Sequence, residues 1–238
     1  MNTMKNLRML WCLMAFAMLA LLPATLRGAS DLDVRQPVLD GQGRFWIYRN
    51  GPAHPPMPFS PYGWSSDATN LTELIHVDLD CRENPNPDSK IAMSTETEQC
   101  IRVHVDWKDA TWISIAFISG PAKPPWWGET NRGRYFDLSG LAKKKLVFYA
   151  RGEHGGEIIQ AQMGMLGDKP FGDSLHNPVI GQEMKLTQDW VRQEIDLKDL
   201  SPADLAHICN GFGVIVERAN QSGSPTETQF YLDDIYFE

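Results

Sequence analysis

The chain contains 238 residues, 42% of them hydrophobic, and carries a formal net charge of −8 at neutral pH. This composition excludes an intrinsically disordered chain, and the acidic balance argues against nucleic acid or an anionic membrane surface as a partner. The length is sufficient for one all-β domain with a sizeable core, and no repeat of 20 to 50 residues divides the chain further.

The first 30 residues have the layout of a secretory signal peptide. Lys5 and Arg8 precede an apolar run over 9–24, and small residues follow at 28–30. We therefore expect a signal over 1–30 and a mature protein that is secreted or held in the periplasm or cell envelope. Its removal takes away three basic and no acidic residues, so the net charge changes from −8 to −11. The alternative is an uncleaved membrane anchor, because the apolar run approaches spanning length.

Residues 31–61 are rich in Pro and Gly and contain one short apolar piece, 45–48. We expect this segment to form an extended N-terminal arm laid against a domain over 62–238. The apolar piece could also add an edge strand to that domain.

From Ile101 onward, apolar and polar residues alternate in short segments, which is typical of strands with one buried face. The expected strands cover 101–105, 112–118, 146–151, 158–163, 191–197, 212–216 and 230–237. One short helix is expected over 200–205, where Ser201 stands at the N-cap and Pro202 at the first helical position. At least six strands with almost no helix predict an all-β sandwich of two antiparallel sheets.

Two of the expected strands carry polar or aromatic residues on their second face. These residues are Tyr149 and Arg151 on one strand and Gln160 and Gln162 on the next. We predict that the two faces line one ligand-binding groove.

The loop between the strand at 112–118 and Tyr135 carries two adjacent tryptophans, Trp126 and Trp127, in a proline-stiffened segment. Aromatic faces pack against the C–H patches of sugars, so both are candidate ligand contacts. The alternative is that one or both tryptophans plug the end of the sandwich.

Three cysteines follow the signal. In an exported chain we expect Cys81 and Cys100 to form a disulfide, since they flank a polar excursion over 82–99. Closing a loop of about 20 residues would contribute roughly 3 kcal/mol by the chain-entropy estimate. Cys209 is expected to remain a buried thiol beside the Gly211-Phe-Gly segment.

The motifs from Leu146 onward, which run from Leu-Val-Phe-Tyr-Ala-Arg-Gly-Glu through a Gly-Gly-Glu turn to Phe-Tyr-Leu-Asp-Asp-Ile-Tyr-Phe, resemble those of galactose-binding-like jelly-roll modules. The resemblance covers 62–238. It implies a jelly-roll β-sandwich, and a secreted, non-catalytic protein that binds a polysaccharide or glycan.

The same resemblance implies a metal. The acidic pair Asp233 and Asp234 is similar to the pair that helps to hold a structural calcium in many such modules. Calcium takes six to eight oxygen ligands, so other residues must contribute, and Asp67 is a candidate.

Two other functions remain open. The same scaffold supports envelope assembly factors that use the groove for a protein partner. A glycan-cleaving enzyme is the third hypothesis, because Glu194-Ile-Asp196 resembles part of the Glu-x-Asp-x-x-Glu strand of laminarinase-like glycosidases, whose carboxylates share one face. The third acid of that motif is replaced by Asp199 in a turn, which favours a non-catalytic strand.

Overall fold

The structure is a computed structural model of the chain, and it describes residues 33–49, 57–81, 99–119, 134–141, 144–164, 172–223 and 225–238, with the backbone alone for 62–65. The predicted signal over 1–30 lies outside these residues. Residues 32–238 form one compact unit, so no domain boundary separates the arm from the residues after 62. No helix in the described ranges is both long and apolar enough to cross a membrane.

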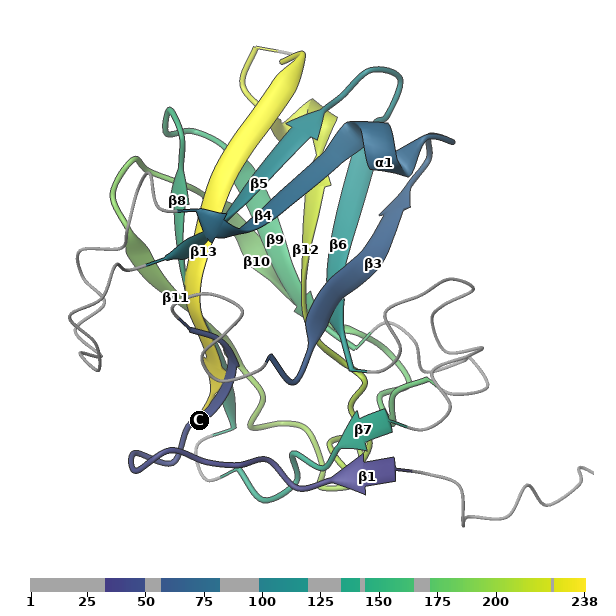
Figure 1. Cartoon of the computed structure of the whole chain (residues 1–238), viewed down its shortest axis with the longest axis vertical. Coiled ribbons are helices and arrows are strands. Elements are labelled where there is room, and N and C mark those ends of the chain that lie inside the picture. The colour runs from purple at the N-terminus through teal and green to yellow at the C-terminus, as the bar shows by residue number, and fades with distance from the viewer. Residues whose placement is uncertain are drawn as a thin grey trace, which may run out of the picture. The chain divides into compact units, whose positions relative to one another are not determined.

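The fold is a jelly-roll β-sandwich of two antiparallel sheets (Figure 1). One sheet contains, in spatial order, β11 (Val191–Asp196), β8 (Lys145–Gly152), β13 (Glu227–Phe237), β5 (Cys100–Asp106) and β4 (Ile75–Cys81), and β2 (Phe45–Tyr48) also pairs with β13. The second sheet contains β10 (Val179–Lys185), β9 (Ile158–Met163), β12 (Asn210–Glu217), β6 (Trp112–Ile118) and β3 (Ser60–Ser66). The all-β prediction is therefore confirmed.

The core lies between the two sheets and follows the alternation seen in the sequence. Phe148 and Leu232 from one sheet and Phe212 and Ile159 from the other belong to one buried cluster. The ring centroids of Phe148 and Phe212 lie 5.2 Å apart, across the interior. Their burial supplies the main favourable free energy of folding, at about 25 cal/mol per Å² of apolar surface.

The predicted arm is more deeply integrated than a laid-on segment. All four residues of β2 are buried, and Phe45, Ile47 and Tyr48 belong to the main core. Upstream, β1 (Asp33–Arg35) forms a two-stranded parallel ladder with β7 (Arg134–Phe136). The apolar piece adds a strand, which was the alternative to a purely extended arm.

The helix expected over 200–205 is absent, and the prediction was wrong. Ser201 and Asp204 do exchange capping hydrogen bonds, since the Ser201 N–H and hydroxyl both donate to the Asp204 carboxylate, at 2.9 and 2.7 Å. The segment nevertheless forms only turns, because Ile208 pairs with Phe136 in an isolated bridge directly afterwards. The described helical segments lie elsewhere, at α1 (Leu71–Leu74) and at the short 3-10 helix Arg218–Asn220.

Cys81 and Cys100 are cross-strand neighbours on β4 and β5, and both are buried. No disulfide joins them in the structure, where the Cys100 thiol donates a hydrogen bond to the backbone carbonyl of Cys81 at 3.2 Å. Burial raises the pKa of the Cys100 thiol, which disfavours the reactive thiolate. The disulfide stays a prediction. Cys209 is a buried thiol packed with Ala116, as expected.

Close approach of strands requires a glycine at one position of the second sheet. A Cβ added to Gly213 on β12 would lie 2.8 Å from the carbonyl oxygen of Ile115 on β6 and 3.1 Å from Cγ of Gln162 on β9. The backbone oxygen cannot move without shifting the ladder.

We therefore expect Gly213→Ala to lower the free energy of unfolding by about 1–3 kcal/mol, the usual scale of overpacking. Gly140→Ala is the matched control, because no atom lies within 4 Å of its added Cβ. Urea denaturation of both variants measures the difference. Equal stability of the two would contradict the close packing of β12 between β6 and β9.

Candidate functional site

The structure does not assemble the groove predicted from the sequence. Tyr149 and Arg151 lie on β8 and point away from the core in the first sheet, whereas Gln160 and Gln162 lie on β9 on the outer face of the second sheet. The prediction of a single groove was wrong, because the turn after Gly152 carries the chain from one sheet to the other instead of closing a hairpin within one sheet.

Arg151 is largely buried on the outer face of the first sheet. It is 8% exposed, and its guanidinium carbon lies 4.3 Å from the ring centroid of Tyr231 and 5.8 Å from that of Trp190. It also donates a hydrogen bond to the backbone carbonyl of Gln188 at 3.2 Å. Stacking and burial make this arginine part of the scaffold. Tyr149 packs beside the same cluster and is half-buried.

The two glutamines also hold strands together. Gln162 is buried and donates to the Ser114 hydroxyl at 3.0 Å, and Gln160 donates to the backbone carbonyl of Gly181 at 3.0 Å. Gln160 retains partial exposure. The remaining ligand candidates, Trp126 and Trp127, lie outside the described residues.

The three predicted calcium ligands do not form one cluster. Asp67 accepts hydrogen bonds from the hydroxyl and the backbone N–H of Thr111, and these lower the pKa of its carboxyl to about 2. Asp233 and Asp234 are both buried, in a bulge of β13. Within the described ranges, no three His, Cys, Asp or Glu side chains form a group that could hold a metal ion.

The carboxylates of the enzyme hypothesis are engaged in ion pairs. Glu194 contacts Lys145 and Arg192, each at 2.7 Å, and Asp196 contacts Lys198 at 2.9 Å. Hydrogen bonds from Lys145 and then Arg192 lower the pKa of Glu194, and those from the backbone N–H and side chain of Lys198 lower that of Asp196. A glycosidase needs one carboxyl with a raised pKa as proton donor, so this pair does not fit that role.

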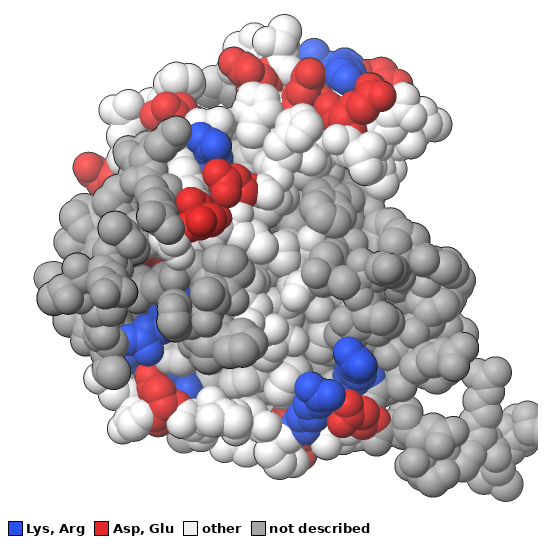
Figure 2. All heavy atoms as spheres, viewed as in Figure 1, with Lys and Arg blue, Asp and Glu red and all other residues white. Residues whose placement is uncertain are grey.

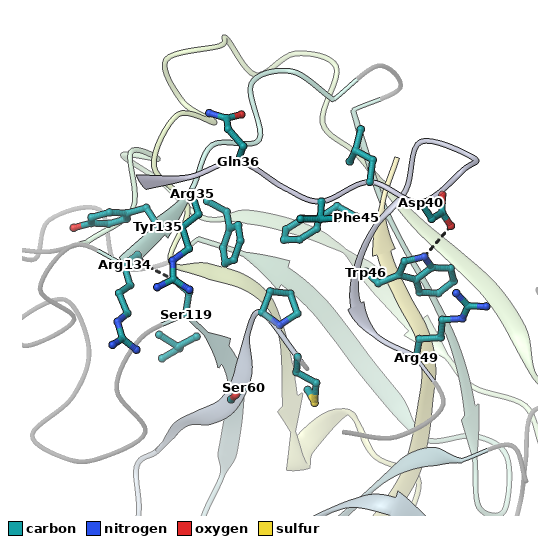
Figure 3. A pocket seen from close by; sticks show the side chains of 16 residues that line it. Arg35, Gln36, Asp40, Phe45, Trp46, Arg49, Ser60, Ser119, Arg134 and Tyr135 are labelled. Carbon is teal, nitrogen blue, oxygen red and sulfur yellow. Dashed lines mark hydrogen bonds between the residues drawn. The ribbon is translucent and has the colours of Figure 1, made fainter. Parts of the chain in front are cut away.

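A pocket of about 690 Å³ lies between the arm and one end of the sandwich (Figure 3). This volume is within the usual range of ligand sites, about 300–1,000 Å³. Its residues come from β1, β2, β3, β6 and β7 and their connections. They are Arg35, Gln36, Val38, Leu39, Asp40, Phe45, Trp46, Arg49, Met57, Pro58, Ser60, Ile118, Ser119, Arg134, Tyr135 and Phe136.

The pocket has an aromatic wall. The ring centroids of Phe45 and Phe136 lie 4.9 Å apart, and both rings approach Phe59 beneath them, at 6.1 and 5.1 Å. Trp46 donates its indole N–H to the Asp40 carboxylate at 2.9 Å, which fixes the ring (Figure 3). A packed, oriented aromatic wall is suited to the apolar face of a ligand.

Charged and polar groups stand around this wall. Figure 3 places Arg35, Arg134 and Ser119 on one side of the pocket, and Arg49 with Asp40 on the other. Burial opposes ionisation of Asp40, but hydrogen bonds, first from the Arg44 backbone N–H and then from the indole, outweigh it and lower the pKa. The arrangement can hold a ligand with one apolar face and several hydrogen-bond acceptors.

A second hollow, of about 430 Å³, lies near the turn that follows β8. It is lined in part by His104, Glu153 and Glu227. A hydrogen bond from the Tyr231 hydroxyl is the main cause that lowers the pKa of Glu153. This hollow lacks an aromatic wall among its lining residues, so it is the weaker candidate.

Sequence reasoning missed the first pocket for a topological reason. The apolar piece that contains Phe45 and Trp46 was visible in the sequence. No local sequence pattern shows that Arg35 and Arg134 lie on one pair of strands. They are brought together by the parallel ladder between β1 and β7, whose strands are about a hundred residues apart. The adjacency of an arginine and an aromatic residue in Arg134-Tyr135-Phe136 was the one available signal.

Comparison with known proteins agrees with this architecture. Residues 63–238 match the family model described as Carbohydrate binding domain 30. No curated protein matched the chain in a comparison of sequences.

Several solved structures are similar to the chain. A family 30 carbohydrate-binding module has 13% identity and a TM-score of 0.46, with 82% of this chain and 86% of that chain covered. The family 30 module of a cellulosomal cellulase of Clostridium thermocellum has 15% identity and a TM-score of 0.43, covering 82% and 96%. TmCBM61, solved in complex with β-1,4-galactotriose, has 16% identity and a TM-score of 0.38, covering 79% and 94%.

The family model spans almost three quarters of the sequence, from residue 63 in β3 to the last residue. It includes strands of both sheets of the sandwich. Families of this kind consist of modules that bind carbohydrate and are in general non-catalytic. The chain belongs to the Carbohydrate binding domain 30 family.

Proposed function

We propose that the protein is an exported, non-catalytic carbohydrate-binding protein that recognises a polysaccharide or an envelope glycan. The observation that carries this proposal is the family match over 63–238. Family membership supports carbohydrate binding as the activity, whereas the identity of the glycan depends on the side chains of this chain's own site.

The pocket beside the arm supports the proposal because its residues offer both kinds of contact that a sugar needs. Phe45 and Phe136 line its aromatic wall and provide apolar surface for C–H patches. Gln36, Ser60 and Ser119 provide groups that can bond hydroxyls. Export is supported by the signal-like segment over 1–30, and it would place the protein where extracellular or envelope glycans occur.

The direct test is a glycan array probed with the full mature chain, in calcium and in chelator. We expect binding to at least one polysaccharide without release of reducing ends. A chain that retains no glycan on the array, while a protein partner is recovered from an envelope extract, would contradict the proposal. Release of reducing ends would contradict its non-catalytic part.

We propose further that Trp126 and Trp127 contact the bound sugar. In the sequence they fall between Ser119 and Arg134, and both of these residues line the pocket. Trp126→Ala and Trp127→Ala should each lose roughly 1–3 kcal/mol of affinity, the scale of burying one large apolar side chain. Affinity and melting temperature are measured on the same samples.

Trp112→Ala is the control for that experiment. Trp112 is partly exposed at the start of β6, six residues from Ile118 at the pocket, which corresponds to about 20 Å along a strand. Its variant should keep the affinity for glycan. If the Trp126 and Trp127 variants instead melt early and bind in proportion to the folded fraction, the tryptophans plug the sandwich.

Calcium remains part of the proposal as a structural ion near Asp233 and Asp234. The adjacency of these two acidic residues in β13 supports it, because carboxylate oxygens are ligands that calcium prefers. Calcium at a hundredfold excess over its dissociation constant should stabilise the fold by about 2.7 kcal/mol. Asp234→Asn should abolish the increment while tolerating the positive φ of 44° at this position. Identical melting curves of the parent protein in calcium and in chelator would remove the ion from this account.

A further inference from the structure

The pocket beside the arm is basic, although the chain as a whole is acidic. Three arginines line it, Arg35, Arg49 and Arg134, against one described acid, Asp40. The formal net charge of the whole chain is −8. Carboxylates outnumber basic groups in the sequence, so a local excess of arginine in this pocket points to the kind of ligand that it fits.

Two of these arginines are positioned by the same ladder. Asp33 pairs with Arg134 in the parallel register of β1 and β7, and Arg35 follows two residues after Asp33. Since side chains of a strand alternate between faces, Asp33, Arg35 and Arg134 share one face. Figure 2 shows basic and acidic side chains gathered over β1 and β7 at the lower end of the molecule, and Figure 3 shows both arginines on one side of the pocket.

The Asp33 carboxylate does not prevent Arg35 from binding a ligand. Arg35 contacts Asp33 at 2.6 Å, but the two side chains are 53% and 47% exposed. Ion pairs this exposed contribute little, about 0–1 kcal/mol, because water screens them. A ligand carboxylate or sulfate can therefore share or replace the contact at low cost, and the net charge of the three groups is positive.

The far side of the pocket adds a third cation next to an aromatic face. The guanidinium carbon of Arg49 lies 4.8 Å from the ring centroid of Trp46. A guanidinium stacked on an indole remains charged. The pocket therefore has apolar rings between one basic side with Arg35 and Arg134 and another with Arg49. This arrangement matches a sugar that has apolar C–H faces and carries an anionic substituent.

The negative charge elsewhere on the chain does not exclude such a ligand. At physiological ionic strength, charges farther apart than about 8 Å are largely screened, so the arginines that touch the ligand dominate. Charge-assisted bonds from arginine forks to planar anions are also about twice as strong as neutral ones. The binding should weaken as salt is added.

We propose that this pocket binds a glycan bearing an anionic group, either the carboxylate of a uronate or a sulfate ester, with Arg35 and Arg134 as the residues that contact the anion. The inference rests on the proposed carbohydrate binding and names the class of sugar. The family match begins at residue 63, so Arg35 and the other arm residues of the pocket lie outside the matched segment, whereas Arg134 lies within it.

The experiment measures the affinity of the full mature chain for four probes by affinity electrophoresis and calorimetry. The probes are polygalacturonate, its methyl ester, a sulfated galactan and a neutral glucan. We expect one of the two anionic probes to bind at least about tenfold more tightly than the methyl ester and the glucan, the scale of one charged hydrogen bond. Which anionic probe binds identifies the carboxylate or the sulfate as the recognised group.

Variants locate the contact. The double variant Arg35→Gln with Arg134→Gln should lose the tenfold preference and its salt dependence. Arg134→Lys keeps the charge without the fork and should lose part of the preference. Arg192→Gln is the matched control, since Arg192 is an arginine of comparable exposure, paired with Glu194 at 2.7 Å, and does not line the pocket. Melting curves confirm that each variant is folded.

The outcomes separate this inference from the proposed function. Equal binding of polygalacturonate, sulfated galactan, the methyl ester and the glucan would overturn the anionic preference and leave carbohydrate binding intact. An unchanged preference in the folded double variant, or its loss in Arg192→Gln alone, would overturn the assignment to this pocket. Absence of binding to every probe and to the glycan array would contradict the proposed function itself.

Discussion

A bulge in β13 allows this strand to pair with β5 before the bulge and with β2 of the N-terminal arm after it. Upstream of the bulge, Glu227–Leu232 pairs with β5, and downstream of it Ile235–Phe237 pairs with β2, while β8 runs along both halves. The register shifts between Asp233 and Tyr236, and Asp234 takes a positive φ of 44° there. A bulge bends a strand and increases its twist. This allows one strand of 11 residues to serve as the centre of the first sheet and as the anchor of the N-terminal arm.

The pocket depends on that anchor. Because β2 is paired to the end of β13, Phe45 is held in the core and Trp46 packs against Tyr236 with tilted rings, whose centroids lie 4.8 Å apart. The chain upstream of β2 is held separately, by the parallel ladder of β1 with β7 and by a hydrogen bond from the Asp137 N–H to the Arg35 carbonyl at 2.9 Å. The segment between these two anchors has to cross the end of the sandwich, and the pocket lies beneath it. Its floor is thus built from ordered β-structure, which positions side chains more accurately than an isolated loop.

Local patterns predicted most of the fold, and the parts they missed depend on long-range pairing. Alternation located β5, β6, β8, β9, β11, β12 and β13, because each has one face in the core. It missed β1, β3, β4, β7 and β10. The residues of β10 are mostly half-buried or exposed at a sheet edge, so no strict period marks that strand. It could not assign β8 and β9 to different sheets. Tyr149 and Gln160 would lie on an outer face whether the two strands paired in one sheet or belonged to two. The parallel ladder of β1 and β7, which carries Arg35 and Arg134, has no periodic pattern in the sequence.

The environments of the arginines distinguish structural from ligand-binding roles in a way that residue type does not. Arg151 looked like a sugar contact in the sequence, yet it is stacked on Tyr231 and bonded to a backbone carbonyl, so a ligand would have to replace contacts that are already buried and desolvated. Arg35 and Arg134 are exposed on a ladder at the mouth of a pocket, and the Arg35 contact with Asp33 is itself exposed to water. Exchanging water for a charged hydrogen bond is favourable, whereas exchanging one buried contact for another gains little. The end of the sandwich that carries the arm is therefore better placed to recognise a charged sugar than the sheet face that carries Arg151.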